Sequence, residues 1–375
     1  MWISERSRKL RVERLKANKN QFDLFPSVGP WQRTALQRAF LFRRVRSALR
    51  SLTPDTRHRA LALCLLLTTF CLLPSAFCHP AARGLYEVRE VQPNVFVWIP
   101  DDVLDPEGDP QFSRAGNAGF IVTTEGVVVV NTTNTPFHAR ELLYEIRRRS
   151  DLPVRYVINT DSEGDLTLGN EVFVDQQASI VSTNAAQTEM RHYRQELLQR
   201  LNEDEHWRLQ ARMRGIHPTP PSQAFDPEMS LRLGGQEIKL LSLSGGHSAG
   251  DAVVYLPGAK LLFLGHLYEN GFFPHLASSD VRRWIEILHQ VEGWDVETYI
   301  PAHGPPGDKK QLGEFRQFLE WLVAEIQARI QQGKSLDEVR RDLNPAEVYH
   351  WSARELAPRA VEAVYKQLEE TPPAE

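Results

Sequence analysis

The chain has 375 residues, of which 42% are hydrophobic and 25% are charged. This composition is typical of a soluble globular protein with one large domain or two, and it excludes collagen-like, coiled-coil, disordered and polytopic membrane proteins. The formal net charge of −4 hides an asymmetry, because 15 of the 44 basic residues but 4 of the 48 acidic residues lie before residue 60. The first 59 residues therefore carry a net charge of +11, against −15 for the remainder.

The first predicted piece is a basic N-terminal extension over residues 1–59. We interpret it as the product of a start site set too far upstream, because a start near Val45 would leave an ordinary signal-peptide n-region. The alternative is a cytoplasmic arm that contacts nucleic acid or anionic lipid. The extension contains no nucleic-acid-binding motif, so we expect no nucleic-acid partner.

Residues 60–78 are predicted to be a signal peptide. The stretch 60–82 contains no Asp, Glu, Lys or Arg, follows a basic run, and offers a cleavage site after Cys78. The alternative is an uncleaved membrane anchor, because the stretch is just long enough to span a bilayer. The main domain is therefore expected in the periplasm or secreted, or outside the cytoplasm on an anchor, with membrane contact only through residues 60–78. All three cysteines lie in this stretch, so none is available to the main domain as a ligand or nucleophile.

From residue 84 the chain alternates predicted strands and helices. Apolar and alternating runs predict strands at 85–88, 94–99, 116–123, 126–130, 154–158, 230–233, 237–242, 252–256, 261–264 and 298–300. Helical periodicity is found at 136–149, 184–214, 279–291 and through most of 309–368. Two β-rich halves, each ending in strand, polar loop and helix, predict an α/β (α+β) fold, an αββα sandwich over residues 84–308.

Residues 309–375 are predicted to be a C-terminal helical extension. Its periodic apolar residues include Phe315, Phe318 and Leu322, with Val361 and Val364 further on. Such a face either covers the sandwich or forms a dimer interface, and covering is the commoner outcome. The oligomeric state is left open.

Four polar loops, each directly after a predicted strand, carry the candidate chemistry. They are residues 159–166 (Asn-Thr-Asp-Ser-Glu-Gly-Asp-Leu), 244–251 (Ser-Gly-Gly-His-Ser-Ala-Gly-Asp), 264–266 (Leu-Gly-His) and 301–305 (Pro-Ala-His-Gly-Pro). Their order resembles the metallo-β-lactamase superfamily, whose pattern is His-x-His-x-Asp-His after a strand, then Gly-His, Gly-Asp and Gly-His. The resemblance covers about residues 85–306 and extends to the flanking sequences. It implies a sandwich with a metal site at one edge.

The chain departs from the family pattern at four of the seven ligand positions. By position, the family's first-site histidines are Asp161, Glu163 and His247, its second-site ligands are Asp165, Leu166 and His303, and its bridging aspartate is His266. Leucine cannot coordinate a metal, and a neutral imidazole cannot bridge two ions as a carboxylate does. The ordinary dinuclear zinc site is therefore not expected.

Six possible ligands remain, namely Asp161, Glu163, Asp165, His247, His266 and His303. Three carboxylates on one loop cannot all ionise cheaply without a cation, so at least one carboxyl is expected to have a raised pKa in the metal-free protein. One divalent ion, Zn, Mn or Fe, would remove that repulsion, and an oxygen-rich set shifts the preference towards Mn or Fe. Asp165 is the candidate catalytic residue, which would orient a water molecule or accept its proton.

The predicted function is metal-dependent hydrolysis of an ester, thioester or amide bond in a small-molecule substrate. The alternative is a non-catalytic binding protein with a vacated metal site that binds a small ligand. In that case Asp165 caps a helix beginning near Leu166, and His247 and His303 hydrogen-bond to loop backbone. His275, just beyond the His266 loop, either lines the mouth of the site or has a structural role.

Overall fold

The computed structural model describes residues 86–101, 114–200 and 216–370 of the chain, with the backbone alone for 196–200. The predicted basic extension, the predicted signal peptide at 60–78 and the end of the predicted helix at 201–214 lie outside the described residues. Within the described ranges, no helix combines the length and the hydropathy needed to cross a membrane.

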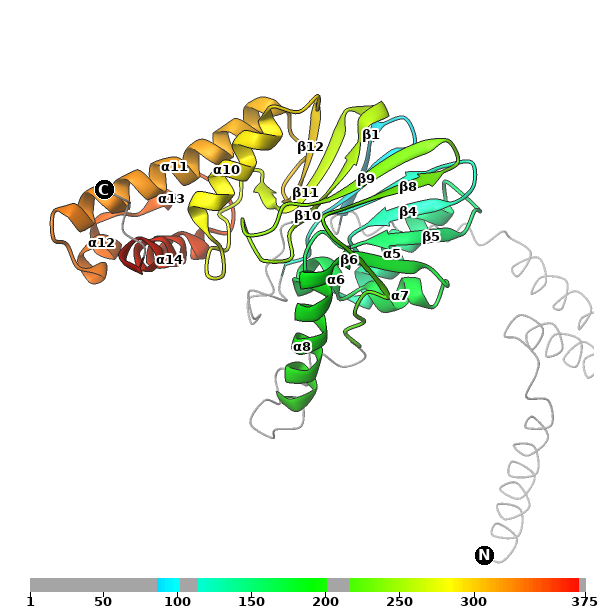
Figure 1. The fold of residues 1–375 in the computed structure, drawn as a ribbon, viewed down its shortest axis with the longest axis horizontal. Coiled ribbons are helices and arrows are strands. Elements are labelled where there is room, and N and C mark those ends of the chain that lie inside the picture. The colour runs from blue at the N-terminus through cyan, green and yellow to red at the C-terminus, as the bar shows by residue number, and fades with distance from the viewer. Residues whose placement is uncertain (1–85, 102–113, 201–215, 371–375) are drawn as a thin grey trace, which may run out of the picture. The chain divides into compact units, whose positions relative to one another are not determined.

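Two β-sheets form the centre of the fold (Figure 1). The first has seven strands in chain order: β1 (Tyr86–Gln92), β2 (Val95–Pro100), β3 (Ala118–Val122), β4 (Val127–Val130), β5 (Val154–Ile158), β6 (Ser179–Thr183) and β7 (Gln223–Phe225). The second has five, in the spatial order β12-β11-β10-β9-β8: β8 (Glu228–Leu233), β9 (Gln236–Ser242), β10 (Ala252–Leu256), β11 (Leu261–Glu269) and β12 (Thr298–His303).

The direction of the strands places the candidate loops together. Strands β4 to β7 are parallel, and so are β11 and β12. The carboxyl ends of parallel strands lie at the same edge of a sheet, which is where ligand sites of such sheets are built. The loop after β5 and the ends of β11 and β12 hold five of the six predicted ligands.

Helices cover the outer faces of the two sheets, and the last helices pack beside α11 (Lys309–Gln331). The helices are α5 (Pro136–Arg147), α6 (Gly164–Thr167), α7 (Asn170–Val174), α8 (Asn184–Arg200), α10 (Val281–Glu292), α11, α12 (Leu336–Asp342), α13 (Pro345–Val348) and α14 (Ala357–Glu370). Helices α5 and α7 accompany the first sheet, while α10 and α11 accompany the second (Figure 1).

Three apolar clusters define the layers. The cluster between the sheets includes Val128 and Phe263, which face each other from the first and second sheet. A second cluster joins the other face of the first sheet to α5, for example through Phe120 and Leu142. The third joins the second sheet to α10, α11 and α14, with Trp284 at its centre. The predicted αββα sandwich is confirmed.

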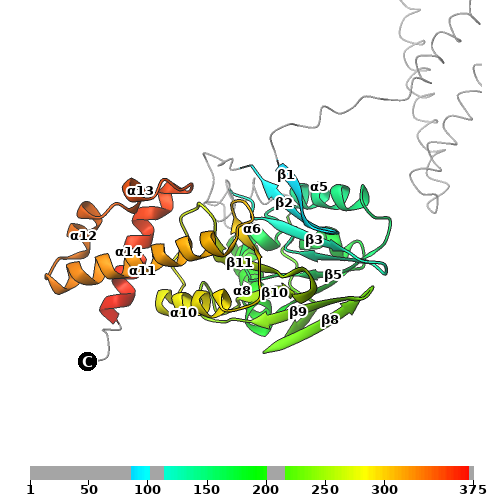
Figure 2. The same cartoon turned by 90° about the horizontal axis from the view of Figure 1, so that it is seen from above.

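The C-terminal helices pack on this third cluster. Phe318 and Leu322 of α11 are buried with Val361 and Val364 of α14. Figure 2 shows α12, α13 and α14 gathered around the far half of α11. The apolar faces predicted for the extension therefore cover a core within the chain.

Several strands differ from the sequence-based expectations. Strand β11 runs to Glu269, beyond the predicted end at residue 264, and all nine of its residues are buried. Its polar residues interrupt the apolar run that marks a buried strand in the sequence. Strands β6 and β7 were not predicted, because β6 contains Ser and Thr and β7 has three residues.

Candidate metal centre

The loop after β5 positions Asp161. The backbone N–H of Thr160 donates to Asn131 Oδ1 at 3.0 Å, and the backbone N–H of Glu163 donates to Asp161 Oδ1 at 2.9 Å. Helix α6 begins at Gly164, with Glu163 as its N-cap residue and no side-chain capping bond. The alternative reading of Asp165 as a helix cap was wrong, because Asp165 lies inside the first turn.

Gly265 brings β11 close to this loop. It has a φ of +54°, and a methyl group at its Cα would lie 2.2 Å from Thr160 Oγ1. A side chain at this position would push the strand away from the loop, and the left-handed backbone conformation also favours glycine. The close approach places the next residue, His266, against the acidic loop.

His266 lies between two aspartates. Its Nδ1 is 3.0 Å from Asp161 Oδ2, and its Nε2 is 3.1 Å from Asp165 Oδ2. The same Asp165 oxygen lies 2.9 Å from His303 Nε2. Ionised carboxylates only accept hydrogen bonds, so a histidine with carboxylates on both nitrogens is an imidazolium. The His303 side chain contacts Asp165, so the alternative that it bonds to loop backbone was also wrong.

The pKa shifts follow from this arrangement. Burial raises the pKa values of Asp161 and Asp165, but the charge and hydrogen bonds of His266 outweigh burial and hold both below the usual value. Burial lowers the pKa of His266, but the two aspartates raise it well above its usual value. The expectation that repulsion between these two carboxylates raises the pKa of one of them is therefore wrong. His266 lies between the two carboxylates and supplies a positive charge.

The His247 end of the centre is different. His247 is 1% exposed, and neither of its ring nitrogens makes a hydrogen bond. Nε2 lies 3.4 Å from Glu163 Oε1, and Nδ1 lies 3.7 Å from Asp251 Oδ1, which is too long for a hydrogen bond. Burial lowers the pKa of His247, but Glu163 and Asp251 raise it above its usual value. The His247 ring stacks on that of His266, with centroids 4.6 Å apart.

Asp251 shapes the loop that carries His247. Its carboxylate accepts hydrogen bonds from the backbone N–H groups of Gly246, at 3.1 Å, and Ser248, at 3.0 Å. It also accepts a 2.7 Å bond from Ser248 Oγ. These bonds hold the loop around His247 without engaging its ring, so the alternative that His247 bonds to loop backbone was wrong as well.

Potential ligand atoms fall into three overlapping groups in the described residues, and within each group they lie within 4.8 Å of one another. The groups are Asp161–His247–His266, Asp165–His266–His303 and Glu163–His247–His275. The structure thus brings together all six predicted ligands, and it adds His275. The third group contains ring nitrogens that lack hydrogen-bond partners, on His247 and at His275 Nδ1.

The two-ion arrangement of the resembling family does not fit this centre. Leu166 is 0% exposed, and it packs so closely on Gly116 that a methyl group there would lie 2.2 Å from Leu166 Cδ2. His266 fills the space between the aspartates. The His247 end suits a metal ion better, because His247 and His275 have buried ring nitrogens without hydrogen-bond partners, and each imidazole offers one lone pair when it is deprotonated.

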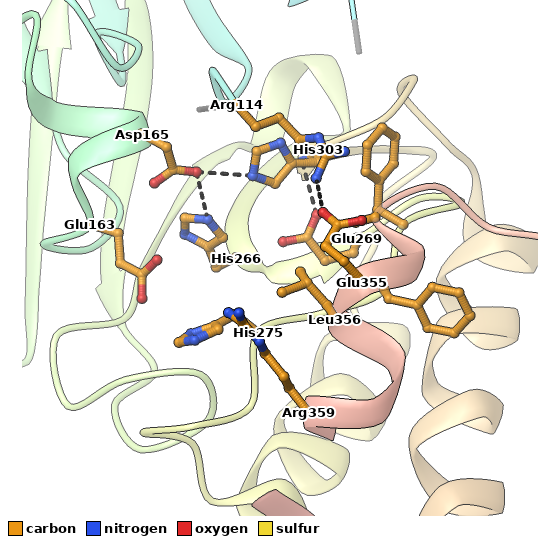
Figure 3. A pocket seen from close by; sticks show the side chains of 13 residues that line it. Arg114, Glu163, Asp165, His266, Glu269, His275, His303, Glu355, Leu356 and Arg359 are labelled. Carbon is orange, nitrogen blue, oxygen red and sulfur yellow. Dashed lines mark hydrogen bonds and ion pairs between the residues drawn. The ribbon is translucent and has the colours of Figure 1, made fainter. Parts of the chain in front are cut away.

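A pocket of about 330 Å³ opens onto the centre (Figure 3). Glu163, Asp165, His266, His275 and His303 line it. The remaining lining residues are Arg114, Glu269, Phe272, Phe273, Ala353, Glu355, Leu356 and Arg359. This volume lies at the lower end of the range for small-molecule sites.

Several lining residues were not predicted from the sequence. Glu269 is 3% exposed; burial and Asp165 raise its pKa well above the usual value, although His266 opposes this. One of its oxygens, Oε2, accepts a 3.0 Å bond from the backbone N–H of His303. Arg114 pairs with Glu355 at 3.1 Å, and Arg359 extends towards His275 from α14 (Figure 3). The one available signal was Glu269, an acidic residue at the end of a buried apolar run.

The family model of the metallo-beta-lactamase superfamily matches residues 113–303, which include all six predicted ligands. The chain belongs to the metallo-beta-lactamase superfamily. Two curated members named metallo-beta-lactamase type 2 resemble it. The one from Elizabethkingia meningoseptica is 25% identical over 182 residues, 48% of this chain and 64% of that protein. The one from Bacteroides fragilis is 23% identical over 108 residues, 28% of this chain and 43% of that protein. The chain thus spans less than two thirds of the length of either.

Solved structures of the superfamily share the fold. A metallo-beta-lactamase from Pontibacter korlensis matches with a TM-score of 0.50 at 22% identity, covering 63% of this chain and 99% of that one. The stereoselective inverting sec-alkylsulfatase Pisa1 from Pseudomonas sp. matches with a TM-score of 0.56 at 16% identity, covering 75% of this chain and 50% of that one. This superfamily member therefore combines a hydrolase-like fold with candidate metal-binding residues.

Proposed function

We propose that this protein is a metal-dependent hydrolase with one divalent ion, acting on an ester, thioester or amide bond of a small molecule. The observation that carries the proposal is the pair of unpartnered, fully buried nitrogens of His247 beside Glu163, next to an open pocket. Glu163 and His247 would hold the ion, with Asp161 and His275 as the neighbouring ligand groups. When bound, such an ion polarises a carbonyl oxygen and lowers the pKa of water.

Two carboxyl groups are assigned roles beside the ion. Asp165 Oδ1 is buried and accepts no hydrogen bond, whereas Oδ2 faces His266 and His303. Asp165 would orient water through Oδ1 while the two imidazoles fix its side chain. Glu269 lies in the same pocket, and burial raises the pKa of its carboxyl well above the usual value, which suits a group that would supply a proton to the leaving group.

The substrate is proposed to carry a negative charge. Arg359 lines the pocket and makes no ion pair with a carboxylate in the described part of the chain. A guanidinium binds carboxylate or phosphate groups through two parallel hydrogen bonds. A cyclic amide of the β-lactam type belongs among the compounds to test, since the named relatives are metallo-beta-lactamases.

The second candidate is a binding protein without catalysis, and the His266 network favours it. Both ring nitrogens of His266 and Nε2 of His303 have carboxylate partners without an ion. The pocket would then bind an anionic ligand through Arg359. The two candidates differ in whether metal is bound at all.

The location and organisation of the chain remain proposals from the sequence. They comprise a basic extension over 1–59, a signal peptide or anchor over 60–78, the catalytic domain over 84–308 and the helical extension over 309–375. The protein would be periplasmic or secreted, with no nucleic-acid partner, and any membrane contact would be made through residues 60–78.

Metal content and hydrolysis test the proposal together. Protein purified without chelator is expected to contain about one equivalent of a divalent ion and to hydrolyse members of a panel of chromogenic esters, thioesters and amides. Carboxylated members should react with a lower KM than their neutral analogues, and Arg359→Ala should remove that preference. Absence of bound metal, together with failure of added metals to bind, would reject the hydrolase in favour of the binding protein.

A further inference from the structure

His275 is the member of the third ligand group that lies outside the family pattern. It follows β11 in a segment, residues 270–280, that precedes α10. Its Nδ1 is buried and makes no hydrogen bond, and its side chain lines the pocket beside Glu163. A histidine that merely filled space in this wall would be expected to bond to a neighbouring polar group.

The two partners of His275 are also available for coordination. Both nitrogens of the fully buried His247 lack hydrogen bonds, and Glu163 approaches its Nε2 at 3.4 Å. One ligand atom from each of the three residues lies within 4.8 Å of the other two, which suits a common ion. Two imidazoles and a carboxylate together form a recurring metal-binding set.

The other two groups are already engaged. Both nitrogens of His266 face aspartate oxygens at 3.0 and 3.1 Å, and His303 Nε2 faces Asp165 at 2.9 Å. An ion bound by either of those groups would have to break these contacts. An ion bound by Glu163, His247 and His275 leaves all of them intact.

We infer that the metal of this protein is held by Glu163, His247 and His275, at a position displaced from the family centre towards the pocket. This inference rests on the proposed function for the existence of an ion, and it adds the ligand set. His266 then joins Asp161 and Asp165 into a fixed support. Glu163 and His275 line the same pocket as Arg359, so an ion that they held would be next to the space for a substrate.

The donor set changes the expected metal preference. Two nitrogen ligands and one oxygen ligand suit zinc and cobalt, whereas the oxygen-rich set predicted from the sequence favours manganese or iron. The affinity is therefore expected to follow the order zinc, cobalt, manganese, from tightest to weakest. Cobalt is the useful probe, because its visible absorption reports the ligands directly.

The experiment is titration of the metal-free full chain with Co(II), followed by calorimetry and visible absorption. His275→Ala is expected to weaken Co(II) binding by about 100-fold or more, since loss of a supporting group alone costs 10- to 100-fold. His303→Ala changes a family ligand position outside the proposed set and should weaken Co(II) binding less than His275→Ala does, because His303 contacts Asp165 and not the proposed ligands. The exposed His289 pairs with Glu320, and neither residue lines the pocket, so His289→Ala is the matched control.

A second variant should produce a new absorption band, which complements the loss of Co(II) affinity in His275→Ala. His275→Cys should give a Co(II) complex with a thiolate charge-transfer band that the parent lacks. All natural cysteines lie at or before residue 78, and the parent titration controls for them.

Three outcomes distinguish the possibilities. Loss of binding in His275→Ala and the new band in His275→Cys support the inference. Binding that His303→Ala abolishes and His275→Ala preserves would overturn it while leaving the proposed hydrolase intact. A parent chain that binds neither Co(II) nor Zn(II) would overturn both.

Discussion

Replacing His266 by glutamine tests whether the imidazolium holds the acidic loop together. In the metal-free protein, His266 is 5% exposed and contacts Asp161 and Asp165 at 3.0 and 3.1 Å. Removing the charge from a buried ion pair costs about 3–5 kcal/mol, because the partner carboxylates stay buried. His266→Gln should therefore unfold at a temperature about 6–10 °C lower, at roughly 2 °C per kcal/mol for a chain of this size.

The pKa shifts also predict how the stability of the protein changes with pH. The raised pKa of His266 means that its stabilisation is fully present below the unfolded value of about 6.5 and is lost as pH rises through the folded value. The lowered pKa values of Asp161 and Asp165 mean that their stabilisation is present above about 3.8 and is lost as pH falls through the folded values. Ionisation of Glu269, whose pKa is raised, further destabilises the protein as pH rises above about 4.5.

The metal-free parent should consequently be most stable between about pH 3.8 and 4.5. Its stability should fall as pH rises further, first through Glu269 and then, towards alkaline pH, through His266. His266→Gln should flatten that alkaline fall. Urea unfolding in the presence of chelator, followed at several pH values, measures both effects. His289→Gln is the control, because this exposed pair should contribute less than about 1 kcal/mol. An unchanged midpoint and pH profile in His266→Gln would refute the imidazolium assignment.

Three further predictions follow from the site and the sequence. Gly265→Ala should destabilise the fold by about 2–4 kcal/mol in urea unfolding, because φ is positive there and the added methyl group would collide with Thr160. Gly258→Ala is the control and should be nearly neutral, because no atom lies close to that position. Equal effects of the two substitutions would argue against the close approach of Gly265 to the loop. The family ligand types can be restored at the four changed positions by Asp161→His, Glu163→His, Leu166→His and His266→Asp. This variant should bind zinc more tightly than the parent in calorimetry. An unchanged zinc affinity would mean that the loops do not converge as described. Mass spectrometry of the exported protein should find a chain beginning after Cys78, and retention of residues 60–78 would instead favour an anchor.

The fold was largely readable from the sequence because its signals are local. Alternating strands, glycine turns and helical periodicity gave both sheets and the covering helices. The end of β11 was missed because His266 and Glu269 are polar residues in a strand that is buried throughout. In the sequence such polar residues indicate a loop, because the tertiary contacts that let them be buried in a strand cannot be read from it.

The candidate site was predicted in its residues but not in its interactions. Family order placed the six ligands on one edge, and the structure brings them together. The sequence could not show that His266 would lie between Asp161 and Asp165, since that depends on how closely β11 approaches the loop. The sequence offered a place at the mouth of the site as one of two alternatives for His275, and the structure confirms that His275 lines the pocket. Arg359 was not predicted, because it lies in no motif and reaches the pocket only through folding.

Glu355, Leu356 and Arg359 form one wall of the pocket, and this limits where the chain can be truncated. These residues lie some fifty positions beyond the end of the family match at residue 303, yet they face the same space as Asp165 and His266. A fragment trimmed to the family boundary would lose this wall and would also expose the apolar cluster that α11 and α14 cover. The region that matches the superfamily is thus not a self-sufficient domain in this protein. Exchanging it between relatives without the last seventy residues would transfer the candidate metal ligands without one wall of their pocket.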